Sequence, residues 1–261
     1  MGNMDMKLYK KTIKELSEMG IKELHLQNFG EPLFDKNIFK KIKMAHNLGM
    51  KTVIFTNARH FDNKKIRDMI KSDLDELFIS FEGYNKKKFE SIRKGLKYNT
   101  VSENIKKIYI TKKKLKSPTP KIILNVVTIE SHKNKINSFR KKWSKYSDSI
   151  NFQKIHNWSE TMIRGKSPGI CNTFWNYITV SWDGKIFSCC LDWDGRYIMG
   201  DSKKDRLSKI WNNSKYRSFR RMMLYGRIKE IQLCKFCSAM NEDNIYTEMI
   251  RFYIKNMRGR K

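Results

Sequence analysis

The first 170 residues of this chain contain no cysteine, although five cysteines lie between positions 171 and 237. The chain also lacks any run approaching the ~18 consecutive apolar residues that a transmembrane helix needs. The first six residues include no apolar segment typical of a secretory signal. These absences exclude a predicted membrane span, and we expect a cytoplasmic protein.

Acidic residues are scarce, because 26 Asp and Glu stand against 55 Lys and Arg, which gives a formal net charge of +29. Such an excess can attract nucleic acid or another anionic surface. Lysine is nevertheless spread over every predicted helix and accompanies abundant Ile and Asn, which suggests a coding bias toward these residues. We favour a solvated surface over a nucleic-acid partner.

Alternating patterns of helix and strand fill the first part of the chain. Helices are predicted over 6–19, 36–48, 63–71, 85–115 and 132–146, and strands over 21–29, 52–56, 76–81, 121–128 and 149–156. This alternation predicts βαβ units and a parallel sheet, either doubly wound or a whole or partial barrel. We expect a first domain over 1–157, a linker over 158–170 and a second, small domain over 171–261.

The cysteines belong to this small domain, where short strands over 175–181 and 185–189 flank a predicted turn at Gly184. Helices are predicted near 205–225. Cysteines at one end of a cytosolic chain indicate metal binding rather than disulfides. Four thiolates hold a [4Fe–4S] cluster or one tetrahedral zinc ion, and five unrelated thiols are the remaining alternative. Structural zinc sites more often use two Cys-x-x-Cys pairs, and only Cys234 and Cys237 form one.

Four motifs resemble the radical S-adenosylmethionine (SAM) superfamily, in its branch with a SPASM or twitch extension. Gly30-Glu31-Pro32 is similar to the family's Gly-Glu-Pro motif after the second strand. Thr56-Asn57 matches the usual end of the third strand. The segment from Ser80 to Gly83 resembles Ser-x-Asp-Gly, with Glu82 in place of Asp. The cysteines are similar to the extension's Cys-x(9–15)-Gly-x(4)-Cys followed by Cys-x-x-Cys.

The resemblance implies an α/β fold, a partial (β/α)6 TIM-like barrel lacking its first strand, followed by a small α+β iron–sulfur domain. Chemistry in such barrels takes place at the C-terminal ends of the strands. The implied SAM-binding residues are Gly30, Glu31, Pro32, Asn57, Ser80 and Asn125. The implied ligands of an auxiliary [4Fe–4S] cluster are Cys171, Cys189, Cys234 and Cys237.

Several neighbouring residues have alternative interpretations. Asn125 is either a SAM contact or a hydrogen-bonded strand residue. Arg93 either approaches the SAM carboxylate or is an exposed helix residue, which we favour. His25 and His156 are expected to be hydrogen-bonded strand residues rather than ligands. Cys190 is not required by the family's pattern and is the spare thiol.

The family's Cys-x-x-x-Cys-x-x-Cys motif, which holds the SAM-cleaving cluster, is missing, through either truncation or degeneration. The resemblance implies that the complete protein cleaves SAM and abstracts hydrogen from a peptide, protein or small-molecule substrate. Flavodoxin or ferredoxin would supply the electron. We expect no SAM cleavage from this chain alone, and weak or absent SAM binding. The alternatives are a non-catalytic iron–sulfur or peptide-binding module, or a zinc-stapled, basic nucleic-acid-binding protein.

Overall fold

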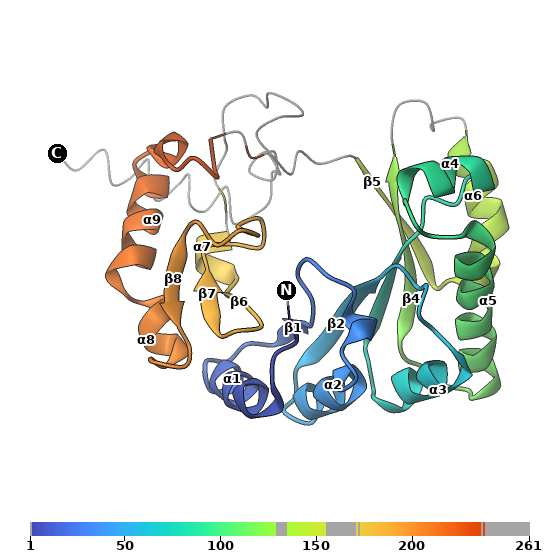
Figure 1. The fold of residues 1–261 in the computed structure, drawn as a ribbon, viewed down its shortest axis with the longest axis horizontal. Coiled ribbons are helices and arrows are strands. Elements are labelled where there is room, and N and C mark those ends of the chain that lie inside the picture. Colours follow the sequence, from blue (N-terminus) through green and yellow to red (C-terminus); the bar gives the residue numbers. More distant parts are fainter. Residues whose placement is uncertain (1, 129–134, 155–170, 172, 236, 238–261) are drawn as a thin grey trace. The chain divides into compact units, whose positions relative to one another are not determined.

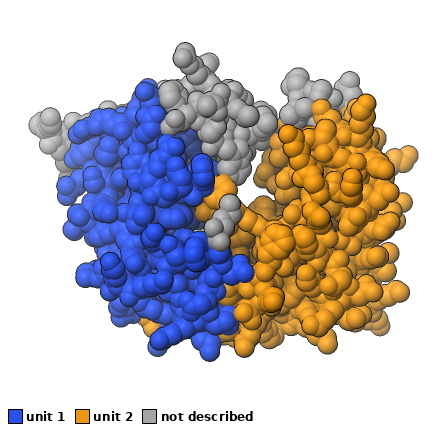
Figure 2. Space-filling model, in the orientation of Figure 1, with its two compact units in different colours: residues 1–15, 156–261 blue, residues 16–155 orange. Residues whose placement is uncertain are grey.

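The chain folds into two compact units in the computed structural model, which describes residues 2–128, 135–154, 171, 173–235 and 237. One unit contains residues 1–15 and 156–261, and the other contains residues 16–155 (Figure 2). The first 15 residues therefore belong with the cysteine-bearing unit, whereas a division at residue 157 places them with the barrel. Among the described residues, no helix is both long and apolar enough to cross a membrane.

A five-stranded parallel sheet forms the centre of unit 16–155, with its strands in chain order (Figure 1). The strands are β1 (Glu23–His25), β2 (Lys51–Thr56), β3 (Glu76–Ser80), β4 (Lys121–Thr128) and β5 (Ser149–Lys154). The helices between them are α2 (Ile38–His46), α3 (Asn63–Lys71), α4 (Lys86–Ile92), α5 (Tyr98–Lys114) and α6 (Ile136–Trp143), with short 3-10 turns η1 (Pro32–Phe34) and η3 (Ser144–Tyr146). The predicted parallel α/β fold is confirmed. β1 is shorter than predicted.

Local sequence signals account for where these helices begin and end. The side chains of Asp62 and Asn85 cap α3 and α4 by accepting hydrogen bonds from backbone N–H groups three residues later. Gly49 lies in the turn between α2 and β2 and has a φ of +75°. Its N–H donates a hydrogen bond to the carbonyl of His46. A side chain would be strained at that left-handed position, so glycine permits the turn into β2.

Strand alternation separates two faces of the sheet. One face carries the buried Ile54, Leu77, Ile79 and Leu124, which pack with helical residues such as Ile105. Each such side chain contributes about 1.5–3 kcal/mol through burial. The opposite face carries Phe55 and Phe78, whose rings stack at 4.4 Å between centroids. Beyond these rings, toward the C-terminal strand ends, this second face becomes polar.

The cysteine-bearing unit contains an antiparallel three-stranded sheet of β6 (Thr179–Val180), β7 (Lys185–Phe187) and β8 (Ile198–Asp201). Its helices are α1 (Met6–Glu18, of which residues 6–15 belong here), α7 (Thr173–Asn176), α8 (Leu207–Trp211) and α9 (Ser214–Leu224), followed by η4 (Ile228–Glu230). The predicted strand over 175–181 is wrong in its first part, because α7 contains Trp175. The predicted turn is present, with Gly184 at a φ of +90°.

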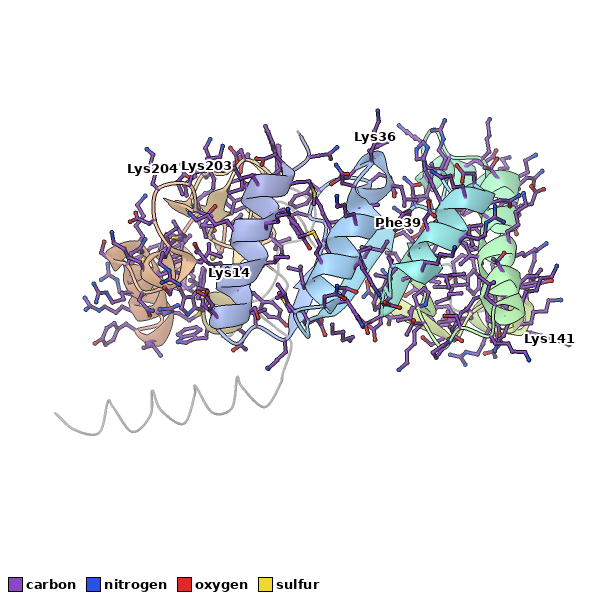
Figure 3. The ribbon with its side chains drawn as sticks, turned by 90° about the horizontal axis from the view of Figure 1, so that it is seen from below. Lys14, Lys36, Phe39, Lys141, Lys203 and Lys204 are labelled. Atoms are coloured by element: carbon purple, nitrogen blue, oxygen red, sulfur yellow. The ribbon has the colours of Figure 1, made fainter. Side chains whose placement is uncertain are left out.

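Lysine side chains project from both units. Lys14, Lys203 and Lys204 are exposed in one unit, and Lys36 and Lys141 are exposed in the other (Figure 3). Exposed lysines are therefore present on both units.

Glu15 stabilises the cysteine-bearing unit from a distant part of the chain. Its buried carboxylate accepts a hydrogen bond of 2.7 Å from the N–H of Leu207, the first residue of α8. Arg206, at the N-cap position, supplies no side-chain cap. Glu15 therefore performs the capping role that a local Ser or Asp usually performs.

We expect Glu15→Ala to lower the free energy of unfolding by about 1–2 kcal/mol, since it removes a buried acceptor and leaves the helix N-terminus uncapped. Chemical denaturation, monitored by circular dichroism, measures this loss. Glu15→Gln is the matched control, because its amide oxygen still accepts the bond and should preserve at least half of the stability difference. Equal losses in both variants would contradict the capping role.

Candidate cluster and cofactor sites

Glu31 joins two of the sequence motifs at the C-terminal edge of the parallel sheet. Its Oε1 accepts a hydrogen bond of 2.6 Å from the Thr56 hydroxyl, and its Oε2 accepts one of 2.8 Å from the N–H of Asn57. It also caps η1 by accepting from the N–H of Leu33 at 3.3 Å. The loop after β1 is thereby tied to the end of β2.

These bonds determine what Glu31 can still offer to a ligand. A carboxylate has about four acceptor positions, and three are already used within the protein. One position on Oε2 remains for an incoming amino group. Gly30 is exposed, and a Cβ added to it would meet no atom within 4 Å, so the backbone beside Glu31 is open to close approach. Pro32 is buried at the start of η1 and holds the loop in place.

A polar row crosses the sheet near the same edge. Ser80, Asn125 and Asn151 are register partners on β3, β4 and β5. The Asn151 amide donates to Asn125 Oδ1 at 3.1 Å, and the Asn125 amide donates to Gln153 Oε1 at 3.2 Å. Asn125 is therefore a hydrogen-bonded strand residue, as one of its two interpretations predicts, and its remaining donor and acceptor positions lie among polar neighbours. Asn151 and Gln153 were not identified from the sequence, although strand periodicity places them on this face.

The segment after β3 serves a structural purpose. Arg93 donates two hydrogen bonds of 2.7 Å to the carboxylate of Glu82, which is 1% exposed. Arg93 is thus half-buried and paired with a carboxylate, rather than a simple exposed helix residue. A Cβ on Gly83 would lie 2.1 Å from the Phe81 ring, so only glycine fits there. The Glu82–Arg93 pair fixes the chain as it leaves the polar row.

Of the two histidines expected in strands, the structure describes one. His25 lies in β1 with its Nε2 2.7 Å from Glu23 Oε1, which agrees with a hydrogen-bonded strand residue. This bond is the main reason that the pKa of Glu23 is lowered from its ordinary value. His156 lies outside the described residues.

Four cysteines come from three separate segments of the other unit. Cys171 precedes α7, Cys189 follows β7, and Cys234 and Cys237 follow η4. Cys234 is buried in an apolar cluster, against which Cys171 and Cys237 also pack. The other buried members of this cluster are Phe174, Met223, Ile228 and Ile231.

Electrostatic interactions connect these four thiols with one another and with the neighbouring Cys190. Burial raises the pKa of Cys189 to about 12, and repulsion from Cys190, Cys171 and Cys237 adds to the shift. Burial also raises the pKa of Cys234, followed by repulsion from Cys189, Cys171 and Cys237. A group of mutually repelling thiolates without a cation is unfavourable in a buried site, so this donor set fits a metal centre.

A zinc ion and a four-iron cluster arrange their thiolates differently. Within the described ranges, no three His, Cys, Asp or Glu side chains are close enough to share one metal ion. A zinc ion gathers all its thiolates at about 2.3 Å from one point. A four-iron cluster instead binds each thiolate on a different iron.

A buried aspartate shapes the loop that carries two of the cysteines. Asp192 is fully buried and accepts hydrogen bonds from the N–H groups of Arg196 and Tyr197, at 2.9 and 3.0 Å, and from the Ser188 hydroxyl at 3.2 Å. The closed loop leaves Cys189 half-buried and Cys190 exposed. Both cysteines lie beyond the end of β7, whereas the predicted strand continued to residue 189. Asp192 was missed because a single Asp in a loop carries no distinctive pattern.

Profiles of two known protein families match this chain. The profile of the radical SAM superfamily matches residues 1–128, and that of the SPASM iron–sulfur cluster-binding domain matches residues 171–238. The SAM-dependent 2-deoxy-scyllo-inosamine dehydrogenase of Niallia circulans is 22% identical over 92% of this chain and 82% of its own length.

Solved structures with similar folds include BtrN in complex with AdoMet and 2-DOIA, which has a TM-score of 0.62 at 19% identity and covers 94% of this chain and 85% of its own. Streptococcus suis SuiB bound to the precursor peptide SuiA has a TM-score of 0.65 at 14% identity, covering 96% of this chain and 67% of its own. The predicted cofactors, an iron–sulfur cluster and SAM, are those of the two matched domains. The chain belongs to the radical SAM superfamily, in the branch that carries a SPASM domain.

Proposed function

We propose that this chain supplies the SAM-binding barrel and the auxiliary cluster of an enzyme that generates a radical from SAM and abstracts hydrogen from its substrate. The observation that carries the proposal is the group of four interacting cysteines in the unit matched by the SPASM profile. The cluster would contribute electron transfer or substrate contact. The protein's own residues would bind and orient SAM and the substrate.

The proposed cluster ligands are Cys171, Cys189, Cys234 and Cys237. Their support is the packing of Cys171, Cys234 and Cys237 in one apolar cluster, together with the electrostatic interaction of Cys189 with these three. Each thiol would lose its proton on binding iron, and the iron charge would offset the repulsion among the thiolates. Cys190 is proposed to stay outside the centre.

The proposed SAM-binding residues are Gly30, Glu31, Pro32, Asn57, Ser80 and Asn125. The remaining acceptor position of Glu31 would receive the methionyl amino group of SAM, beside the open backbone at Gly30. The polar row of Ser80 and Asn125 would offer hydrogen bonds to the more distant parts of the cofactor. Phe55 and Phe78 form the apolar layer beneath this row.

The ligands of the SAM-cleaving cluster are not among residues 1–170, which contain no cysteine. The 261-residue chain is therefore proposed to bind SAM weakly and to leave it uncleaved unless thiolates are supplied from outside this sequence. A cytoplasmic setting, with flavodoxin or ferredoxin as the electron donor, completes the proposal for the active protein.

Two classes of substrate are compatible with the similar proteins. One relative is named as a dehydrogenase of the small molecule 2-deoxy-scyllo-inosamine. One solved structure, that of SuiB, contains a bound precursor peptide. The match to the relative named for the small molecule covers 82% of that relative's own length, whereas the match to SuiB covers 67% of SuiB. We therefore propose a polar small molecule first and a peptide second.

Anaerobic reconstitution with iron and sulfide tests the proposal. We expect about four irons and four sulfides per chain and the absorption of one [4Fe–4S] cluster. Calorimetry should detect weak SAM binding, and no 5′-deoxyadenosine should form. Zinc bound without iron or sulfide would contradict the proposal and favour a zinc-stapled structure.

A further inference from the structure

One face of α9 lies against the segments that carry two of the cysteines. Tyr216, Arg220 and Met223 are spaced four and three residues apart, so they project from the same side of the helix. Met223 Sδ lies 3.5 Å from the backbone nitrogen of Cys171. Arg220 Nε donates a hydrogen bond of 2.8 Å to the carbonyl of Phe174, in the α7 turn directly after Cys171.

Tyr216 connects this helix face to the other cysteine segment. Its ring is fully buried, and its hydroxyl lies 3.5 Å from the carbonyl of Phe187, the last residue of β7 before the Cys189 loop. Burial raises the pKa of Tyr216, Arg220 acts in the opposite direction, and Cys189 raises it further by a smaller amount. The Tyr216 hydroxyl is therefore influenced by both Arg220 and Cys189.

The guanidinium of Arg220 lies against two aromatic rings. Its central carbon lies 4.5 Å from the centre of the Trp211 ring and 5.3 Å from that of Tyr216, distances at which a cation interacts with an aromatic face. Its Nη2 is buried and has no hydrogen-bond partner among the described residues. Leaving a charged donor unsatisfied is costly, so this group requires an explanation in a folded protein.

We propose that Arg220 is a positioning residue for the auxiliary cluster, whose guanidinium charge and free Nη2 donor stabilise the reduced cluster and raise its reduction potential. This inference rests on the proposed function, because it requires the cluster to be held by the four cysteines. It goes further in assigning a role to a residue that no sequence motif includes.

The physical reason is the change of charge on reduction. Four thiolates outweigh the positive charge of the cluster core, so the centre is negative, and one added electron makes it more negative. A nearby cation stabilises the reduced state more than the oxidised state, and the low dielectric of a buried site strengthens this effect. Net charge and hydrogen bonds are among the factors that set the reduction potential of a cluster.

The test is a redox titration of the reconstituted 261-residue chain, with dithionite as the electron donor and the reduced cluster followed by electron paramagnetic resonance. We expect Arg220→Gln to retain iron and to shift the midpoint potential to more negative values. Arg220→Lys should shift it in the same direction by a smaller amount, since lysine retains the charge but loses the planar fork of donors. Arg221→Gln, at an exposed position of the same helix, should leave the potential unchanged.

The outcomes separate this inference from the proposed function. If the unaltered chain binds no iron–sulfur cluster, the proposed function fails. If it binds one and Arg220→Gln keeps both the iron and the original potential, Arg220 is only structural and the inference is overturned. If Arg220→Gln loses its iron, the midpoint potential of the Arg220→Lys variant is the deciding measurement. An unchanged potential in that variant overturns the inference. Loss of iron from both variants would also assign Arg220 a purely structural role.

Discussion

Replacing Cys189 with serine is expected to remove most of the iron from the reconstituted protein, whereas replacing Cys190 should leave the iron content nearly unchanged. The two cysteines are adjacent, but Cys189 is half-buried and interacts with Cys171, Cys234 and Cys237. Cys190 is exposed. A serine hydroxyl is a poor substitute for a thiolate on iron, so the buried position should be the sensitive one.

Iron and sulfide analysis, together with absorption near the cluster band, measures this difference. The Cys190→Ser variant is the matched control, because it makes the same chemical change one residue away. Loss of iron should also destabilise the small unit, since metal binding and folding are coupled. Equal loss from the two variants would overturn the assignment of Cys189 as the ligand.

Substituting Glu31 with glutamine should weaken SAM binding by roughly tenfold or more and lower the free energy of unfolding by about 1–3 kcal/mol. In either orientation, the new amide places an NH2 group against a backbone N–H, that of Asn57 or that of Leu33. One backbone N–H would lose its acceptor, and the connection between the loop after β1 and the end of β2 would weaken. The remaining acceptor position for the SAM amino group would be lost or displaced.

Calorimetry with SAM and chemical denaturation measure the two effects separately. Glu103→Gln is the control, because Glu103 is exposed on α5 of the same unit and loses the same charge. Unchanged SAM affinity together with reduced stability would show that the Glu31 carboxylate is only structural and that SAM binds elsewhere.

Elements whose hydrophobic pattern continues over many residues were predictable. The strand at 121–128 and the helix at 63–71 have the predicted bounds, because alternation and helical periodicity are properties of the local sequence. The motif residues Asn57 and Ser80 lie at the expected strand ends, since parallel strands bring their C-terminal ends to one edge.

The type and the bounds of the short elements depended on contacts with residues far away in the sequence. β1 ends at His25 rather than at Phe29, and the following loop places Glu31 on Thr56 and Asn57, a pairing across 25 residues that no local pattern encodes. Trp175 lies in a helix rather than a strand. Phe174 beside it packs in the core with Met223, and such packing overrides local strand preference.

The sequence by itself determined the α/β class, the motif positions and the identity of the thiols, because periodicity and residue chemistry are local properties. Only the tertiary structure decided that Glu15 caps α8, that Asp192 closes the loop of Cys189, and that Arg220 lies on the face of α9 with Tyr216 and Met223. Each of these contacts depends on where the chain brings a buried charge, and the energy of a buried charge is set by its neighbours in space.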